Sequence, residues 1–91
     1  MYLEKKQNQL DKLKVEFNKL KAMAILTNPK KRIEMNNHIR PIGNIIEECK
    51  KMLINAAKTK VKPTDSIEIG MEATWAKLQT LVNEAIKKYK V

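Results

Sequence analysis

Apolar residues recur along the first third of the chain at alternating steps of three and four residues. This spacing averages about 3.5 residues, which predicts a helix packed nearly parallel or antiparallel to a neighbour, as in a coiled coil. Lys6 takes one position on this seam, and no Gly or Pro interrupts residues 1–27. We therefore expect one helix that ends near Thr27. Its apolar seam consists of Leu3, Leu10, Leu13, Phe17, Leu20 and Ala24.

Asn28 and Pro29 predict the boundary between the first helix and the second. Asn is a favourable N-cap residue, and Pro fits the first helical position, where its missing N–H costs nothing. A second seam with the same alternation follows this boundary. It consists of Met35, Ile39, Ile42, Ile46, Cys49, Leu53 and Ala56, with His38, Ile45 and Met52 beside it.

Pro41 and Gly43 lie inside this second seam. Proline removes one backbone hydrogen bond and clashes with the preceding turn, so a kink or a break is expected between Asn36 and Pro41. The unbroken apolar register favours a kink, whereas the pair Asn36-Asn37 favours a break. We expect two collinear pieces, the longer running from about Pro41 to Lys58.

Residues 59–64 are polar and predict a connection to a third helix. Asp65, with Glu68 three residues later, resembles a capping box at the start of that helix. Three lysines in the last turns suit the negative end of its dipole. The third seam consists of Met71, Trp75, Leu78, Val82, Ala85 and Tyr89, broadened by Ile67, Leu81 and Ile86.

Three amphipathic segments with short connections predict an all-α fold, a small antiparallel bundle of three long helices in a single domain of residues 1–91. The absence of a fourth helix leaves open a homodimer or a docked partner helix. We expect Ile25, Leu26 and Ile33 to staple the first turn, with a partner site as the alternative. The large apolar residues off the seams are Val15, Ile25, Leu26, Ile33 and Ile54.

Charge is distributed unevenly along the chain, whose net charge is +9. Residues 1–62 hold fifteen basic and six acidic residues, whereas residues 63–91 hold four of each. The excess therefore belongs entirely to the first two helical segments and their connections. Such a balance indicates an anionic partner, either nucleic acid or an acidic protein surface.

Two basic clusters are the candidate contacts for phosphates. Three cations in the first turn of the second segment oppose the helix dipole, and an unexplained cost of this kind suggests a functional anion site. Lysine neutralises phosphates without reading sequence, so low sequence specificity is expected. The candidate residues are Lys30, Lys31, Arg32, Arg40, Lys50, Lys51, Lys58, Lys60 and Lys62.

Other binding modes are less well supported. A helix-turn-helix needs a shorter connection than the one after Lys58 and a basic recognition helix. The few aromatic residues fall mostly on the seams, so stacking on single-stranded bases is not expected. No membrane partner is expected, because the leucine-rich faces are needed for the core. The longest early apolar stretch, residues 22–26, and the polar start of the chain favour a cytoplasmic location.

No enzymatic chemistry is indicated. His38 is the only histidine, and its surroundings do not match the His-x-Leu-Lys-Gly pattern of histidine phosphotransfer domains. Cys49 lies on a seam without a histidine in helical reach, so it is expected to be a buried structural residue. We expect no metal, no cofactor and no catalytic residue.

Two functions of different classes remain open. The first is a small basic protein that binds nucleic acid through phosphate contacts. The second is a regulatory or inhibitory protein, antitoxin-like or immunity-type, that binds another protein through its basic and helical surfaces. A continuous positive stripe would favour the first, and lysines around an exposed apolar surface would favour the second.

Overall fold

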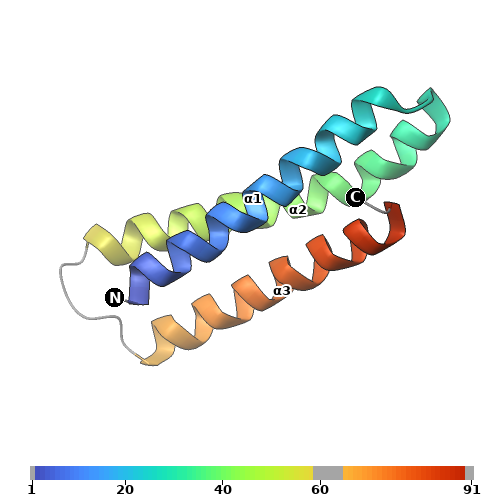
Figure 1. Cartoon of the computed structure of the whole chain (residues 1–91). Helices are drawn as coiled ribbons and strands as arrows, with labels where there is room; N and C mark the ends of the chain where they lie inside the picture. The colour runs from blue at the N-terminus through green and yellow to red at the C-terminus, as the bar shows by residue number, and fades with distance from the viewer. Residues whose placement is uncertain (1, 59–64, 90–91) are drawn as a thin grey trace.

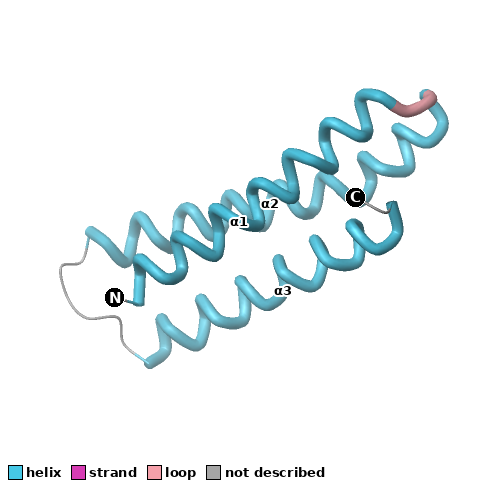
Figure 2. The backbone as a smooth tube through the Cα atoms, in the orientation of Figure 1, coloured by secondary structure: helices cyan, strands magenta, loops and turns pink. Residues whose placement is uncertain are grey.

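The computed structural model describes residues 2–58 and 65–89 and consists there of three helices. Helix α1 spans Tyr2–Leu26, α2 spans Pro29–Lys58 and α3 spans Asp65–Tyr89. They pack side by side, with α2 antiparallel to both others (Figure 1). Apart from residues 27 and 28 in the first turn, every described residue is helical (Figure 2). The predicted all-α bundle is therefore confirmed.

The three predicted seams meet in one core. All seven seam residues of α2 and all six of α3 are buried. In α1, Leu3 and Phe17 are only partly buried, whereas the remaining four apolar seam residues are buried. The 3.5-residue period thus identified the core because it keeps one face of each helix toward its neighbours. Of the residues expected beside the seams, Ile67 and His38 are exposed rather than part of the apolar face.

The first turn has the predicted cap. The side-chain Oδ1 of Asn28 accepts a hydrogen bond from the backbone N–H of Lys31 at 2.8 Å. The carbonyl of Asn28 accepts the first helical bond, from the N–H of Arg32 at 2.9 Å. Pro29 occupies the first helical position, where a missing N–H is tolerated. The predicted capping box of Asp65 lies outside the side chains that the structure describes.

Helix α2 continues through Pro41, so the expected division into two pieces is wrong. Pro41 and Asn37, whose carbonyl loses its helical donor, are both exposed. Water can therefore replace the missing bond, and a helix of this kind can remain whole with its convex side toward solvent. The apolar residues on the opposite side, Ile39 and Ile42, hold the two halves against one core.

Gly43 lets α1 and α2 approach closely. A Cβ atom at this position would lie 3.2 Å from the Cζ of Phe17. The glycine thus makes room for an aromatic ring that is larger than its neighbours on the seam.

The bundle is a rod of 49 × 18 × 18 Å. Among the described residues no helix is long and apolar enough to cross a membrane.

The expected staple of the first turn is wrong. Ile25, Leu26 and Ile33 are all exposed. In a hydrophobic staple, the residue before the N-cap packs against the fourth residue after the N-cap. With Asn28 as the N-cap these residues are Thr27 and Arg32, and the Arg32 guanidinium donates to the Thr27 carbonyl at 3.3 Å. A polar contact therefore holds the turn, and the three apolar side chains remain at the surface.

Candidate nucleic-acid interface

One outward stripe of α2 carries exposed cations and amides along the whole helix. Seven residues make nearly two helical turns, so residues at this spacing share a face. The stripe consists of Lys30, Asn37, Asn44, Lys51 and Lys58, all of them exposed. It covers about 42 Å at 1.5 Å per residue. We call this set, together with Arg40, the α2 stripe.

Arg40 extends the stripe sideways. It is exposed and lies three residues after Asn37 and four before Asn44, which are the spacings of neighbours on a helix surface. Glu47 and Glu48 interrupt the positive surface beyond Asn44. The first of these is paired with Lys50, whose Nζ lies 3.2 Å from the Glu47 carboxylate. Lys50 is therefore partly neutralised and is the weaker candidate in its cluster.

Arg32 does not offer its guanidinium to solvent in the way that the sequence suggested. Its Nε donates to the carbonyl of Ala24 at 3.0 Å, and one terminal nitrogen donates to the carbonyl of Ile25 at 2.9 Å. These carbonyls belong to the last turn of α1, where the dipole is negative and the groups lack helical partners. The cost of a cation at the start of α2 is thus offset by capping of α1.

Lys30 and Lys31 remain exposed beside this cap and make no ion pair with any residue that the structure describes. The backbone N–H groups of Lys31 and Arg32 are already bonded to Asn28. An anion at this turn would therefore contact the two lysine side chains rather than a set of free amides. Lys60 and Lys62 lie outside the described residues.

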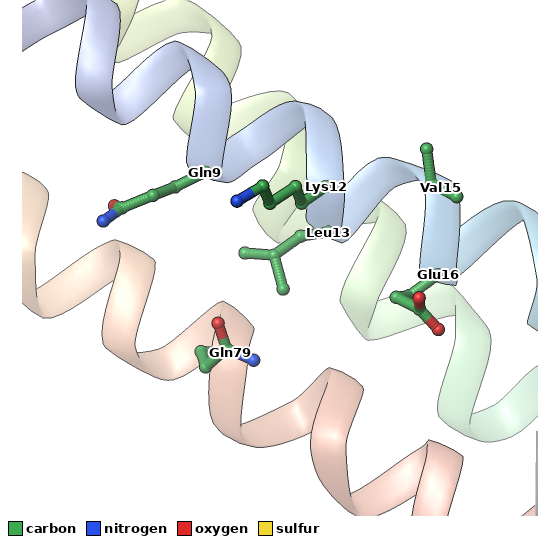
Figure 3. Close-up of a pocket in the computed structure, with 6 residues that line it drawn as sticks. All are labelled: Gln9, Lys12, Leu13, Val15, Glu16 and Gln79. Atoms are coloured by element: carbon green, nitrogen blue, oxygen red, sulfur yellow. The ribbon is translucent and has the colours of Figure 1, made fainter.

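A groove of about 550 Å³ runs between α1 and α3. Figure 3 shows Leu13 on α1 directed toward α3, where Gln79 lies, with Gln9 and Lys12 beside it on α1. These groups include neither a nucleophile beside a base nor a cluster of metal ligands. Within residues 2–58 and 65–89, no group of His, Cys, Asp and Glu is arranged to hold a metal ion.

Lys6 is the centre of a polar cluster near the start of α1. The sequence showed this residue only as a polar position that interrupts the first apolar seam. Its side chain is 5% exposed, and its Nζ lies 2.5 Å from the carboxylate of Glu72 on α3. The Nζ also lies 5.9 Å from the centroid of the Trp75 ring. Trp75 in turn donates its indole N–H to the Lys6 carbonyl at 3.0 Å. These contacts join α1 to α3.

Tyr2 completes the cluster by donating its hydroxyl to the Glu72 carboxylate at 2.9 Å. Burial, together with this hydrogen bond, raises the pKa of Tyr2 to about 12. The hydrogen bonds from Lys6 and Tyr2 lower the pKa of Glu72. Tyr2 is thus held as the neutral phenol, which can donate a hydrogen bond, and Glu72 as the carboxylate, which accepts it. A structural contact is expected to behave in this way.

His38 belongs to a second contact between α2 and α3. Its ring packs edge to face with Tyr89, with the ring centroids 5.9 Å apart, and its Nε2 lies 3.2 Å from the Nζ of Lys88. The same ammonium pairs with Glu34 at 3.2 Å. Burial raises the pKa of Tyr89. This arrangement orders the last turn of α3.

Cys49 is fully buried in the core, as expected. Burial is the main cause that raises the pKa of its thiol to about 11. Because the thiolate is the reactive form of cysteine, such a residue is inert near neutral pH.

Comparisons of the chain with protein-family models, with curated proteins and with solved structures found no match.

Proposed function

We propose that this protein binds nucleic acid along the α2 stripe, through phosphate contacts and with low sequence specificity. One observation carries the proposal: Lys30, Lys51 and Lys58 recur at multiples of seven residues on one exposed face, with Arg40 beside them. These four cations are spread over about 42 Å of the helix, with Glu47 and Glu48 between Arg40 and Lys51, and each can contact a phosphate as a point charge.

The surrounding groups support phosphate contact rather than base stacking. Among the described aromatic residues, Trp75 and Tyr89 are buried and Tyr2 is bonded to Glu72. No aromatic residue falls on the α2 stripe. Base stacking would need such rings at the surface. The exposed amides of Asn37 and Asn44 can donate to phosphates or to base edges.

The test is fluorescence anisotropy with a labelled duplex and a single strand at about 50 and about 200 mM salt. Four contacts on a duplex give a slope near −3.6 in log affinity against log salt, which corresponds to roughly a hundredfold weakening over that range. The stripe variant K30Q/R40Q/K51Q/K58Q should lose most of the affinity and of the slope.

A matched control removes the same charge elsewhere. Lys5, Lys12, Lys77 and Lys87 are exposed residues of α1 and α3, so K5Q/K12Q/K77Q/K87Q lowers the net charge equally. This control should keep most of the slope. Equal losses in both variants would show that overall charge, not the stripe, drives binding. No binding of the unmodified protein at low salt would refute the function itself.

The alternative, a regulatory protein that binds another protein, is favoured by a different observation. Ile25, Leu26 and Ile33 remain exposed at the first turn. Phosphate binding makes no use of them, whereas a protein partner would bury them.

A further inference from the structure

The α1–α2 hairpin extends beyond the end of α3 (Figure 1). The last turn of α3 reaches α2 at Glu34 and His38, through Lys88 and Tyr89. Residues that precede Glu34 on α2, and the last turn of α1 opposite them, therefore lie past the third helix. We call residues 25–33 the hairpin tip.

The hairpin tip exposes three large apolar side chains. Ile25 is 69% exposed, Leu26 is 87% exposed and Ile33 is 66% exposed. The turn itself is held by Asn28 and Arg32, and the core closes just inside the tip at Ala24 and Met35. The fold therefore does not use these three side chains, although burying them would be favourable.

The charge around the tip has one sign. Between Glu16 and Glu34 the chain has no acidic residue and five basic ones. Lys19 is paired with Glu16, and Arg32 is bonded to carbonyls of α1. Lys21 has no ion pair with the described residues, but its Nζ lies 5.3 Å from the centroid of the Phe17 ring, back along α1 from the tip. Lys30 and Lys31 also have no ion pair with the described residues, and they leave the tip positive.

We infer that the hairpin tip docks an acidic amphipathic helix of a partner protein. The apolar face of such a helix covers Ile25, Leu26 and Ile33, and its carboxylates pair with the lysines around them. The inference rests on the alternative protein-binding function. It is separate from the α2 stripe, with which the tip shares only Lys30.

The composition of the tip decides between possible occupants. A second copy of this chain would bring the same positive tip, so like charges oppose a tip-to-tip dimer. Nucleic acid supplies phosphates but little apolar surface for the three aliphatic side chains. A lipid surface is typically met by Trp or Tyr anchors, and residues 25–33 contain no aromatic residue.

The test uses a labelled synthetic peptide with Leu on one helical face and Glu on the other, measured by fluorescence anisotropy with the full chain. A second peptide has Lys at every Glu position. We expect the acidic peptide to bind and the basic one not to bind. The tip variant I25S/L26S/I33S should weaken binding of the acidic peptide by at least tenfold, because it removes the apolar contact.

A matched control replaces three other exposed apolar residues, as V15S/I54S/I69S. Circular dichroism should show unchanged helicity in both variants, since no core residue is altered. The control should bind the acidic peptide like the unmodified protein. The tip variant should also keep its affinity for the duplex, whereas R40Q/K51Q/K58Q should lose duplex affinity and keep the peptide.

Three outcomes would overturn the inference. In the first, the unmodified protein does not bind the acidic peptide. In the second, the control variant weakens peptide binding as much as the tip variant does. In the third, the tip variant loses affinity for the duplex, or for vesicles that contain phosphatidylserine, while peptide binding is unchanged. The duplex result would assign the tip to nucleic acid, and the vesicle result would assign it to lipid.

Discussion

Lys6 shows how a single residue can depart from a pattern and still belong to the core. Its aliphatic stem lies on the seam of α1, and its ammonium reaches Glu72 at the edge of α3. Long cationic side chains commonly bury their stems in this way. Glu72 itself is largely exposed, so the pair is only half desolvated. Packing of the stem is therefore expected to contribute more to stability than the charge does.

Two substitutions of Lys6 separate packing from charge. K6A removes the buried stem and should cost about 2–3 kcal/mol, whereas K6M keeps the stem and should change stability by less than about 1 kcal/mol. Urea unfolding followed by circular dichroism measures both. A large cost of K6M, equal to that of K6A, would show that the ion pair dominates.

The pH dependence of K6M provides a second check. Because the folded-state pKa of Glu72 is lowered from 4.5, its contribution is present above that value and is lost as the pH falls through the folded-state pKa. Lys6 is the largest cause of the lowering. Stability of the unmodified protein should therefore fall more steeply below about pH 4.5 than that of K6M.

At the scale of elements, the turn between α1 and α2 is built from both helices at once. Asn28 caps the start of α2, and Arg32 caps the end of α1 from the neighbouring helix. The sequence showed the first cap because its partner is three residues away. It could not show the second, because a guanidinium that reaches back eight residues requires the two helices to be antiparallel.

Arg32 should accordingly matter for stability more than its charged neighbours. R32Q removes the guanidinium donor from the exposed carbonyl ends of α1 and should cost about 1–2 kcal/mol. K31Q changes the same charge without removing a cap and should shift stability by less than about 0.5 kcal/mol. Thermal unfolding compares the two. If K31Q is as destabilising as R32Q, the capping contacts are not what stabilises the turn.

At the scale of the whole molecule, the net charge of +9 is spread over a rod only 18 Å across. The structure contains few ion pairs among its described residues, and most are at the surface, where each contributes little. Repulsion between unpaired cations therefore opposes folding. The same excess attracts anionic partners, so binding and stability are coupled through charge.

Added salt should consequently stabilise the free protein. Screening of the repulsion at about 0.3 M salt, relative to about 0.01 M, should raise the Tm by several degrees. The variant K5Q/K12Q/K77Q/K87Q lowers the charge from +9 to 9 − 4 = +5 and should respond less. A Tm that falls with salt would mean that the favourable ion pairs outweigh the repulsion.

The sequence by itself determined the three helices and nearly all of the core, because a repeat of apolar residues fixes which face of a helix is buried. It also located the cap at Asn28 and the excess of positive charge. These features depend on neighbours within one or two turns, whose spacing is set by helix geometry.

Only the tertiary structure decided the roles of residues that act across helices. Pro41 remains inside one helix because its lost bond faces solvent, and Arg32 is a cap because α1 ends beside it. Ile25, Leu26 and Ile33 stay exposed because α3 ends level with His38. Such outcomes depend on where helices begin and end relative to one another, which no local spacing encodes.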